Sequence, residues 1–192
     1  MIMCTFKRIV ISNRKLCSRS LPQQIKRLAG QAEMFILREK DLTEMQYKAL
    51  ADQVQQACKA AGMQLICHTF FKAAASIGCR GIHLTLSDFQ QHQAQLRSFE
   101  TIGVSIHSLR EAVYVEEVFT AQGFQGYITA SNIFETSCKA GLSGKGTGFL
   151  EEICRAVSLP VYGLGGITSE NEDLIRKAGA AGACRMSDYM RY

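Results

Sequence analysis

The sequence lacks closely paired cysteines, although it holds eight cysteines in 192 residues. No two of them stand at the C-x-x-C spacing that zinc ribbons and thioredoxin-like redox motifs require. Most lie inside apolar segments, as Cys67, Cys154 and Cys184 do, where a thiol behaves as a small hydrophobic group. We therefore expect reduced, structural thiols in a reducing compartment, with Cys138 as the exception considered below.

Long apolar runs and blocks of charge are absent as well. No segment approaches the roughly 20 apolar residues of a membrane-spanning helix, and Met1–Phe6 is too short for a secretory signal. These absences predict a cytoplasmic protein without a membrane partner. The net charge of +5 comes from dispersed bases, so it does not require nucleic acid, and an anionic small molecule fits equally well.

The chain also lacks hairpin signals and linkers, and short apolar runs alternate instead with segments of helical periodicity. The expected strands are Arg8–Ser12, Glu33–Leu37, Gln64–Cys67, Gly81–Leu84, Thr101–Ile106, Gly126–Ala130, Leu159–Leu164 and Gly182–Met186. The expected helices are Leu21–Gly30, Thr43–Ala61, Phe70–Ile77, Asp88–Leu96, Leu109–Gln122, Phe149–Val157 and Glu170–Ala178, with Ser187–Tyr192 as a short remnant of a last one.

This repeated pattern predicts an α/β protein whose parallel strands close into a (β/α)8 barrel, or TIM barrel. We expect one domain over residues 1–192. The length predicts a minimal barrel with a shortened C-terminal helix. A doubly wound open sheet is the alternative that the repeat count leaves.

Polar residues follow most of the expected strands, at the end where the ligand site of such a barrel lies. Three of the four histidines, His68, His83 and His107, are among them. The further candidates are Arg38, Lys40, Asp88, Ser105, Asn132, Thr136, Cys138, Lys139, Gly165, Gly166 and Ser187. Because arginine forks to phosphate or carboxylate and lysine supplies a point charge, the set predicts an anionic ligand.

The stretch from Pro160 to Asn171 has the parts of a phosphate site. A buried strand ends at Gly165-Gly166, and Thr168 or Ser169 then opens a predicted helix. Glycines allow the backbone to approach a ligand closely, and a helix start offers unpaired N–H groups. We expect Ser187, after the eighth strand, to complete this site.

Five motifs follow one another in the chain, namely Leu37–Leu42, Gly81–Leu84, Gly103–Ser108, Ile133–Lys139 and Gly165–Thr168. In this order and spacing they resemble the thiamine phosphate synthase/TenI family, over nearly the whole chain. The resemblance implies a (β/α)8 barrel and one of two activities. The synthases join a hydroxymethylpyrimidine diphosphate to a thiazole phosphate with magnesium and release diphosphate. The TenI branch binds the thiazole phosphate, and some members tautomerise the thiazole carboxylate phosphate that precedes it.

The resemblance is incomplete in the half of the site that binds diphosphate. Arg38 and Lys40 match the residues that hold diphosphate in synthases. Ile36 replaces a glutamine, and His68-Thr69 replaces the Asn-Asp pair that binds diphosphate and magnesium. Asp88 matches the second magnesium aspartate, and one carboxylate is a weak site for this hard cation. Mg²⁺ is therefore expected only if the chain acts as a synthase.

The half that binds the thiazole phosphate is matched throughout. Its candidates are His83, Ser105, Thr136, Lys139, Gly165, Gly166 and Ser187. The loop from Phe134 to Lys139 resembles the TenI version, but the histidine that serves as acid and base in TenI tautomerases aligns with Asn132, which does not titrate near neutral pH. The catalytic candidates are therefore Asn132 at the family position, His68, His107 or His83 as replacements, and Cys138 as a weaker one.

Our main prediction is a TenI-like protein of thiamine biosynthesis that binds a thiazole phosphate and is a candidate thiazole tautomerase. The alternatives are a thiamine phosphate synthase and a non-catalytic regulatory protein that binds the thiazole phosphate. The expected partner is a phosphorylated thiazole rather than nucleic acid or a membrane. The short last helix would leave apolar barrel surface exposed, which suggests a homo-oligomer.

Overall fold

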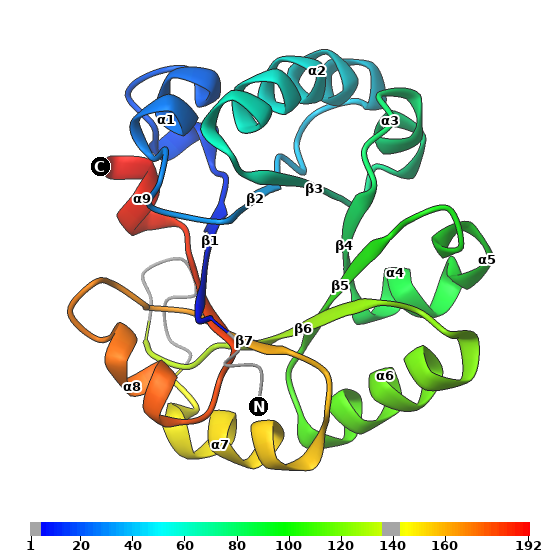
Figure 1. Cartoon of the computed structure of the whole chain (residues 1–192), viewed down its shortest axis with the longest axis vertical. Coiled ribbons are helices and arrows are strands. Elements are labelled where there is room, and N and C mark those ends of the chain that lie inside the picture. The colour runs from blue at the N-terminus through cyan, green and yellow to red at the C-terminus, as the bar shows by residue number, and fades with distance from the viewer. Residues whose placement is uncertain (1–4, 136–142) are drawn as a thin grey trace.

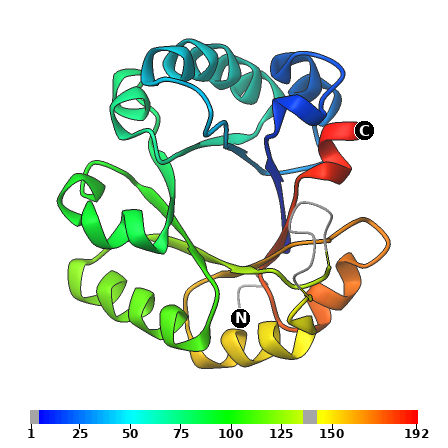
Figure 2. The same cartoon turned by 180° about the vertical axis from the view of Figure 1, so that it is seen from behind.

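The computed structural model describes residues 5–135 and 143–192, and in them eight parallel strands close into a barrel (Figures 1 and 2). The strands follow one another around the ring in chain order, and the last pairs with the first. They are β1 (Lys7–Ile11), β2 (Met34–Leu37), β3 (Gln64–His68), β4 (Gly81–Thr85), β5 (Thr101–Ile106), β6 (Gly126–Ser131), β7 (Val161–Leu164) and β8 (Gly182–Arg185). The predicted (β/α)8 barrel is confirmed, and the open-sheet alternative is wrong.

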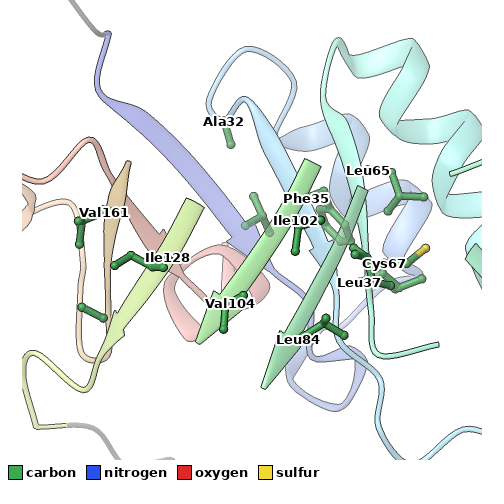
Figure 3. Packing of buried hydrophobic residues seen from close by; sticks show 14 of the residues in the cluster. Ala32, Phe35, Leu37, Leu65, Cys67, Leu84, Ile102, Val104, Ile128 and Val161 are labelled. Atoms are coloured by element: carbon green, nitrogen blue, oxygen red, sulfur yellow. The ribbon is translucent and has the colours of Figure 1, made fainter. Parts of the chain in front are cut away.

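Successive residues of each strand face opposite sides, which divides the apolar side chains between two cores. On β1, Ile9 and Ile11 belong to a cluster inside the barrel, whereas Val10 belongs to the larger cluster between the strands and the helices. Figure 3 shows part of this larger cluster, with Leu84 and Val104 on neighbouring strands. The barrel is therefore packed on both sides of its wall.

Helices surround the ring of strands (Figure 1). They are α1 (Leu21–Arg27), α2 (Glu44–Ala61), α3 (Phe71–Ser76), α4 (Leu86–Gln91), α5 (Gln93–Leu96), α6 (Leu109–Gln122), α7 (Gly146–Ala156), α8 (Glu172–Lys177) and α9 (Ser187–Arg191). The longest, α2, begins where the Thr43 side chain accepts the Gln46 N–H, and it ends at Gly62 in the left-handed conformation. Within residues 5–135 and 143–192, no helix is long and apolar enough to cross a membrane.

Several helices differ from the sequence prediction, as the segment of α4 and α5 and the start of α7 illustrate, and α9 is short as predicted. The segment Asp88–Leu96 forms the separate helices α4 and α5 because His92 leaves the helical conformation, and its ring packs on Phe71 with centroids 5.1 Å apart. Helix α7 begins at Gly146 rather than Phe149, since its first N–H is anchored to the carbonyl of Ile133.

Candidate active site

The carboxyl ends of the strands surround a cavity of about 1230 Å³. Every strand contributes a side chain to its wall: Ile11, Ile36, His68, His83, Ser105, Ser131, Leu164 and Cys184. Most of the site residues predicted from sequence line it, namely Arg38, Lys40, His68, His83, Ser105, His107, Asn132, Gly165, Gly166 and Ser187. Thr136, Cys138 and Lys139 lie outside the described residues.

A chain of hydrogen bonds links β4, β5 and β6 inside the barrel. The His83 ring contacts Tyr127 Oη through Nδ1 at 3.1 Å and Ser105 Oγ through Nε2 at 2.8 Å. The Thr129 hydroxyl donates to the same Ser105 oxygen at 3.2 Å. Burial is the main cause that lowers the pKa of His83 to about 3. A neutral His83 therefore donates one hydrogen bond and accepts another, which orients the Ser105 hydroxyl on the cavity wall.

His68 is a second neutral histidine on this wall. Its ring lies beside His83, with centroids 5.6 Å apart, and its Nδ1 is 2.7 Å from Thr69 Oγ1. Burial, followed by the nearby His83 and the cations after β2, holds the pKa of His68 well below its usual value. The imidazole therefore offers the cavity a hydrogen-bonding group without a charge.

His107 follows β5 and is an exposed residue of the cavity wall. Its Nδ1 lies 3.0 Å from the Ser131 carbonyl oxygen. A carbonyl only accepts, so Nδ1 carries the hydrogen, and in the neutral ring Nε2 keeps its lone pair. The His107 carbonyl in turn accepts from the Lys145 ammonium group, which ties the end of β5 to the start of α7. The arrangement holds a base, Nε2, at the mouth of the cavity.

Arg38 and Lys40 are positioned by the buried residue between them. The Glu39 carboxylate accepts from Ser12 Oγ at 2.7 Å and from Arg14 through its backbone N–H at 2.9 Å and its guanidinium at 2.8 Å. Ser12 Oγ accepts the Arg38 backbone N–H at 2.8 Å. Within the described part of the chain, neither the Arg38 guanidinium nor the Lys40 ammonium pairs with a carboxylate. Two cations without acidic partners therefore favour an anion at this wall.

Gly165 and Gly166 follow β7 with φ angles of 108° and 63°, a region that favours glycine. A Cβ on Gly165 would lie 2.7 Å from Asn132 Cβ, and one on Gly166 would lie 2.5 Å from the Glu135 carbonyl oxygen. The Phe134 N–H donates to the Gly165 carbonyl at 3.0 Å. The two glycines thus line the cavity and also let the loop after β6 pack closely on β7.

The helix predicted to start at Thr168 or Ser169 starts later in the structure. Asn171 closes the intervening loop, because its Oδ1 accepts the Thr168 N–H and its Nδ2 donates to the Gly166 carbonyl, both at 2.9 Å. Helix α8 begins only at Glu172, whose buried carboxylate pairs with arginines. The phosphate site predicted here therefore consists of the backbone after β7 and of Ser187, without the start of α8.

The cavity has further walls that the sequence reasoning missed. They include Ile11, Asn13, Thr85, Ser131, Glu135, Leu164, Cys184, Met186, Asp188, Arg191 and Tyr192. Asn13 closely follows β1, so the rule that polar residues after strands line the site would have found it. Arg191 lies on α9 and Tyr192 follows it, and no strand-end pattern marks them. Their position depends on how α9 packs beside α1 (Figures 1 and 2).

The described residues do not fit a magnesium site built by the protein. No group of three or more His, Cys, Asp or Glu side chains among them is arranged to hold a metal ion. Asp88, the predicted ligand, is not among the described residues of the cavity wall, and its carboxylate accepts from the Thr85 hydroxyl at 2.7 Å. Mg²⁺ prefers octahedral oxygen ligands, whereas the neighbouring His68-Thr69 offers an imidazole and one hydroxyl.

Known proteins resemble this chain in sequence and in fold. The TMP-TENI family model, described as thiamine monophosphate synthase, matches residues 9–188. The thiamine-phosphate synthase of Listeria monocytogenes is 35% identical over 78% of this chain and 70% of its own length. That of Chlorobium phaeobacteroides is 30% identical over 91% of this chain and 84% of its own. Thiamine phosphate pyrophosphorylase from Pyrococcus furiosus has the same fold, with a TM-score of 0.79 at 21% identity over 97% of this chain and 88% of its own.

Proposed function

The chain belongs to the thiamine monophosphate synthase family, and from this premise we propose that it joins a hydroxymethylpyrimidine diphosphate to a thiazole phosphate and releases diphosphate. The names of its relatives favour this synthase activity over the thiazole tautomerase that the sequence predicted first. In this reaction a bond forms between the two substrates as the bond to diphosphate breaks. The chain would then be a transferase of thiamine biosynthesis.

The observation that supports the proposal is that two walls of one cavity each carry groups suited to bind an anion. Arg38 and Lys40 stand after β2, and Gly165, Gly166 and Ser187 stand after β7 and β8. A transfer between two phosphorylated substrates requires such a pair of sites, because both substrates must be held at once with their reacting atoms close together.

Each wall has a distinct role in this proposal. Arg38 and Lys40 hold the diphosphate that leaves. The backbone at Gly165 and Gly166, together with Ser187, holds the phosphate of the thiazole. Between the two walls, the hydroxyl of Ser105 is oriented by its hydrogen bond with His83, and in this proposal it contacts the rings of the substrates.

The test is a direct assay of the purified full chain with both substrates and magnesium in the buffer, with thiamine phosphate measured by mass spectrometry. We expect product, and we expect Arg38→Met to lower kcat/KM by at least about 100-fold, since it removes a bidentate contact to the leaving group. Arg97→Met, on an exposed residue outside the cavity, is the matched control. Complete absence of product from the unchanged protein would remove the proposal.

The geometry of His107 favours thiazole tautomerisation as a second candidate. Its Nε2 keeps a lone pair at the cavity mouth, as a proton carrier requires, whereas Asn132 at the family position cannot titrate. An NMR time course on the thiazole carboxylate phosphate would detect this activity, and His107→Gln would abolish it. Tight binding of the thiazole phosphate without any turnover would instead indicate a regulatory, non-catalytic protein.

A further inference from the structure

The diphosphate wall of the cavity carries two cations, and the carboxylate predicted to bind magnesium, Asp88, accepts a hydrogen bond from Thr85. We infer that Arg38 and Lys40 bind the diphosphate group through their own charges, without a Mg²⁺ ion held by the protein. The inference deepens the proposed function and rests on it only for the identity of the substrate that carries diphosphate.

Lys40 lines the cavity together with Arg38, and the charges of Arg38 and Asp88 both act on it. Burial lowers the pKa of Lys40, Arg38 lowers it further, and Asp88 acts in the opposite direction. The ammonium group therefore experiences the charges of both neighbours, without an ion pair between Lys40 and Asp88. A divalent cation at Asp88 would stand near this ammonium group, where like charges repel each other.

Asp88 itself is held by hydroxyl groups of the protein. Its Oδ2 accepts from Thr85 Oγ1 at 2.7 Å and lies 3.5 Å from Thr69 Oγ1. The Asp88 backbone N–H donates to the same Thr85 hydroxyl oxygen at 3.1 Å, which fixes the first turn of α4. A metal ion at Oδ2 would compete with the Thr85 hydroxyl for this oxygen.

Thr69 is not available as a metal ligand either. Its hydroxyl lies 2.7 Å from His68 Nδ1, so it is already engaged in a hydrogen bond, whichever of the two groups donates. Mg²⁺ prefers several oxygen ligands and gains little from an imidazole. The cations are better suited to the anion, since guanidinium forms two parallel hydrogen bonds to phosphate oxygens and ammonium adds a compact charge.

Calorimetry with inorganic pyrophosphate tests the inference, using the full chain in EDTA and then in excess magnesium. We expect binding in EDTA, with a dissociation constant that magnesium does not tighten by more than about threefold. In EDTA, Lys40→Met should weaken binding by about tenfold or more, because it removes one of the two charges. Lys59→Met, at the far end of α2, is the matched control and should leave binding unchanged.

A variant designed to gain a magnesium site tests the same argument. The double change His68→Asn and Thr69→Asp adds a carboxylate beside Asp88, so we expect magnesium to tighten pyrophosphate binding to it by tenfold or more. A magnesium effect of that size in the unchanged protein overturns the inference, as does the absence of pyrophosphate binding in both buffers. A double variant that magnesium leaves unaffected also contradicts it, because these two positions would then not decide metal dependence.

The inference and the proposed function can fail separately, because one is tested by pyrophosphate binding and the other by formation of thiamine phosphate. Protein that binds pyrophosphate in EDTA but makes no thiamine phosphate removes the proposed synthase activity and supports the inference on the cations. Protein that makes thiamine phosphate but binds pyrophosphate only with magnesium overturns the inference alone.

Discussion

Individual buried histidines set the character of the cavity wall. His68 and His83 are nearly inaccessible, with 4% and 3% of their surface exposed, and burial is the main cause that keeps the pKa of each below its ordinary value. At physiological pH they therefore act as neutral hydrogen-bonding groups and add no charge to that of Arg38 and Lys40 on the β2 side of the cavity. An anion is attracted to the β2 loop rather than to the barrel interior.

Stability is expected to depend on pH through His83. Its pKa is about 3 in the folded protein and near 6.5 when unfolded, so between these values the unfolded chain binds more protons, and stability falls as pH is lowered through this range. From about pH 6 to pH 5, His83 should contribute a loss of about 1 kcal/mol in the free energy of unfolding. His83→Gln keeps hydrogen-bonding groups and should remove that part of the slope in urea titrations.

The control is His92→Gln, at the junction of α4 and α5. This substitution should leave the change in unfolding free energy between about pH 6 and pH 5 as it is in the unchanged protein. Equal slopes for the unchanged protein and for His83→Gln would show that His83 does not titrate in this way.

The strands and helices shape the cavity through the loops that join them at the carboxyl ends of the strands. The loop after β6 packs on the loop after β7, with Ile133 and Phe134 donating their N–H groups to the carbonyls of Leu164 and Gly165. Where the chain enters α7, the N–H groups of Lys145 and Gly146 donate to the carbonyls of Asn132 and Ile133. The described ends of the β6 loop are therefore fixed to the cavity wall after β7 by backbone hydrogen bonds.

Gly165→Ala tests this packing, with Gly62→Ala as its matched control. Both glycines have positive φ, but a Cβ at Gly62 meets nothing within 4 Å, whereas one at Gly165 lies 2.7 Å from Asn132 Cβ. Alanine at Gly62 carries the cost of the left-handed conformation, about 1–2 kcal/mol, and alanine at Gly165 carries at least that cost, because its φ of 108° lies beyond this region. The clash should lower the unfolding free energy of Gly165→Ala by about 1–3 kcal/mol more, as measured in urea. Equal losses would mean that the loop relaxes at no cost.

The whole molecule is closed by an ion-pair cluster at the seam between the first and last strands. Glu172 on α8 accepts from Arg8 Nε on β1 at 3.0 and 3.1 Å, and it also pairs with Arg185 on β8. Arg185 reaches Asp188 on α9 at 3.2 Å. The same cluster therefore supports the β1–β8 pairing and the helix that carries Ser187.

Removing the central carboxylate should be costly. Glu172→Gln leaves the Arg185 guanidinium, only 7% exposed, without its main counter-charge, and we expect a loss of about 3–5 kcal/mol in unfolding free energy. Glu100→Gln is the matched control in the Arg80–Glu100 pair, where both side chains are 64% exposed, and it should cost no more than about 1 kcal/mol. Thermal denaturation of both variants measures these losses. Similar shifts in Tm for the two variants would contradict the role assigned to Glu172.

The sequence by itself determined the order of the strands and the barrel, because both follow from local patterns. Apolar runs such as Arg8–Ser12 and Thr101–Ile106 carry the strand signal, and their even alternation with helices leaves few ways to arrange a parallel sheet. The placement of most candidate residues at one rim follows from the same order, since parallel strands all end on the same side.

Tertiary structure alone decided what those residues can do. The tautomer of His107 depends on the Ser131 carbonyl of another strand, and the start of α8 depends on the side chain of Asn171. Whether Asp88 is available to a metal depends on Thr69, Thr85 and Lys40, which come from three different strand ends. Local periodicity cannot report these properties, because hydrogen bonding, burial and charge at each site arise from residues that only folding brings together.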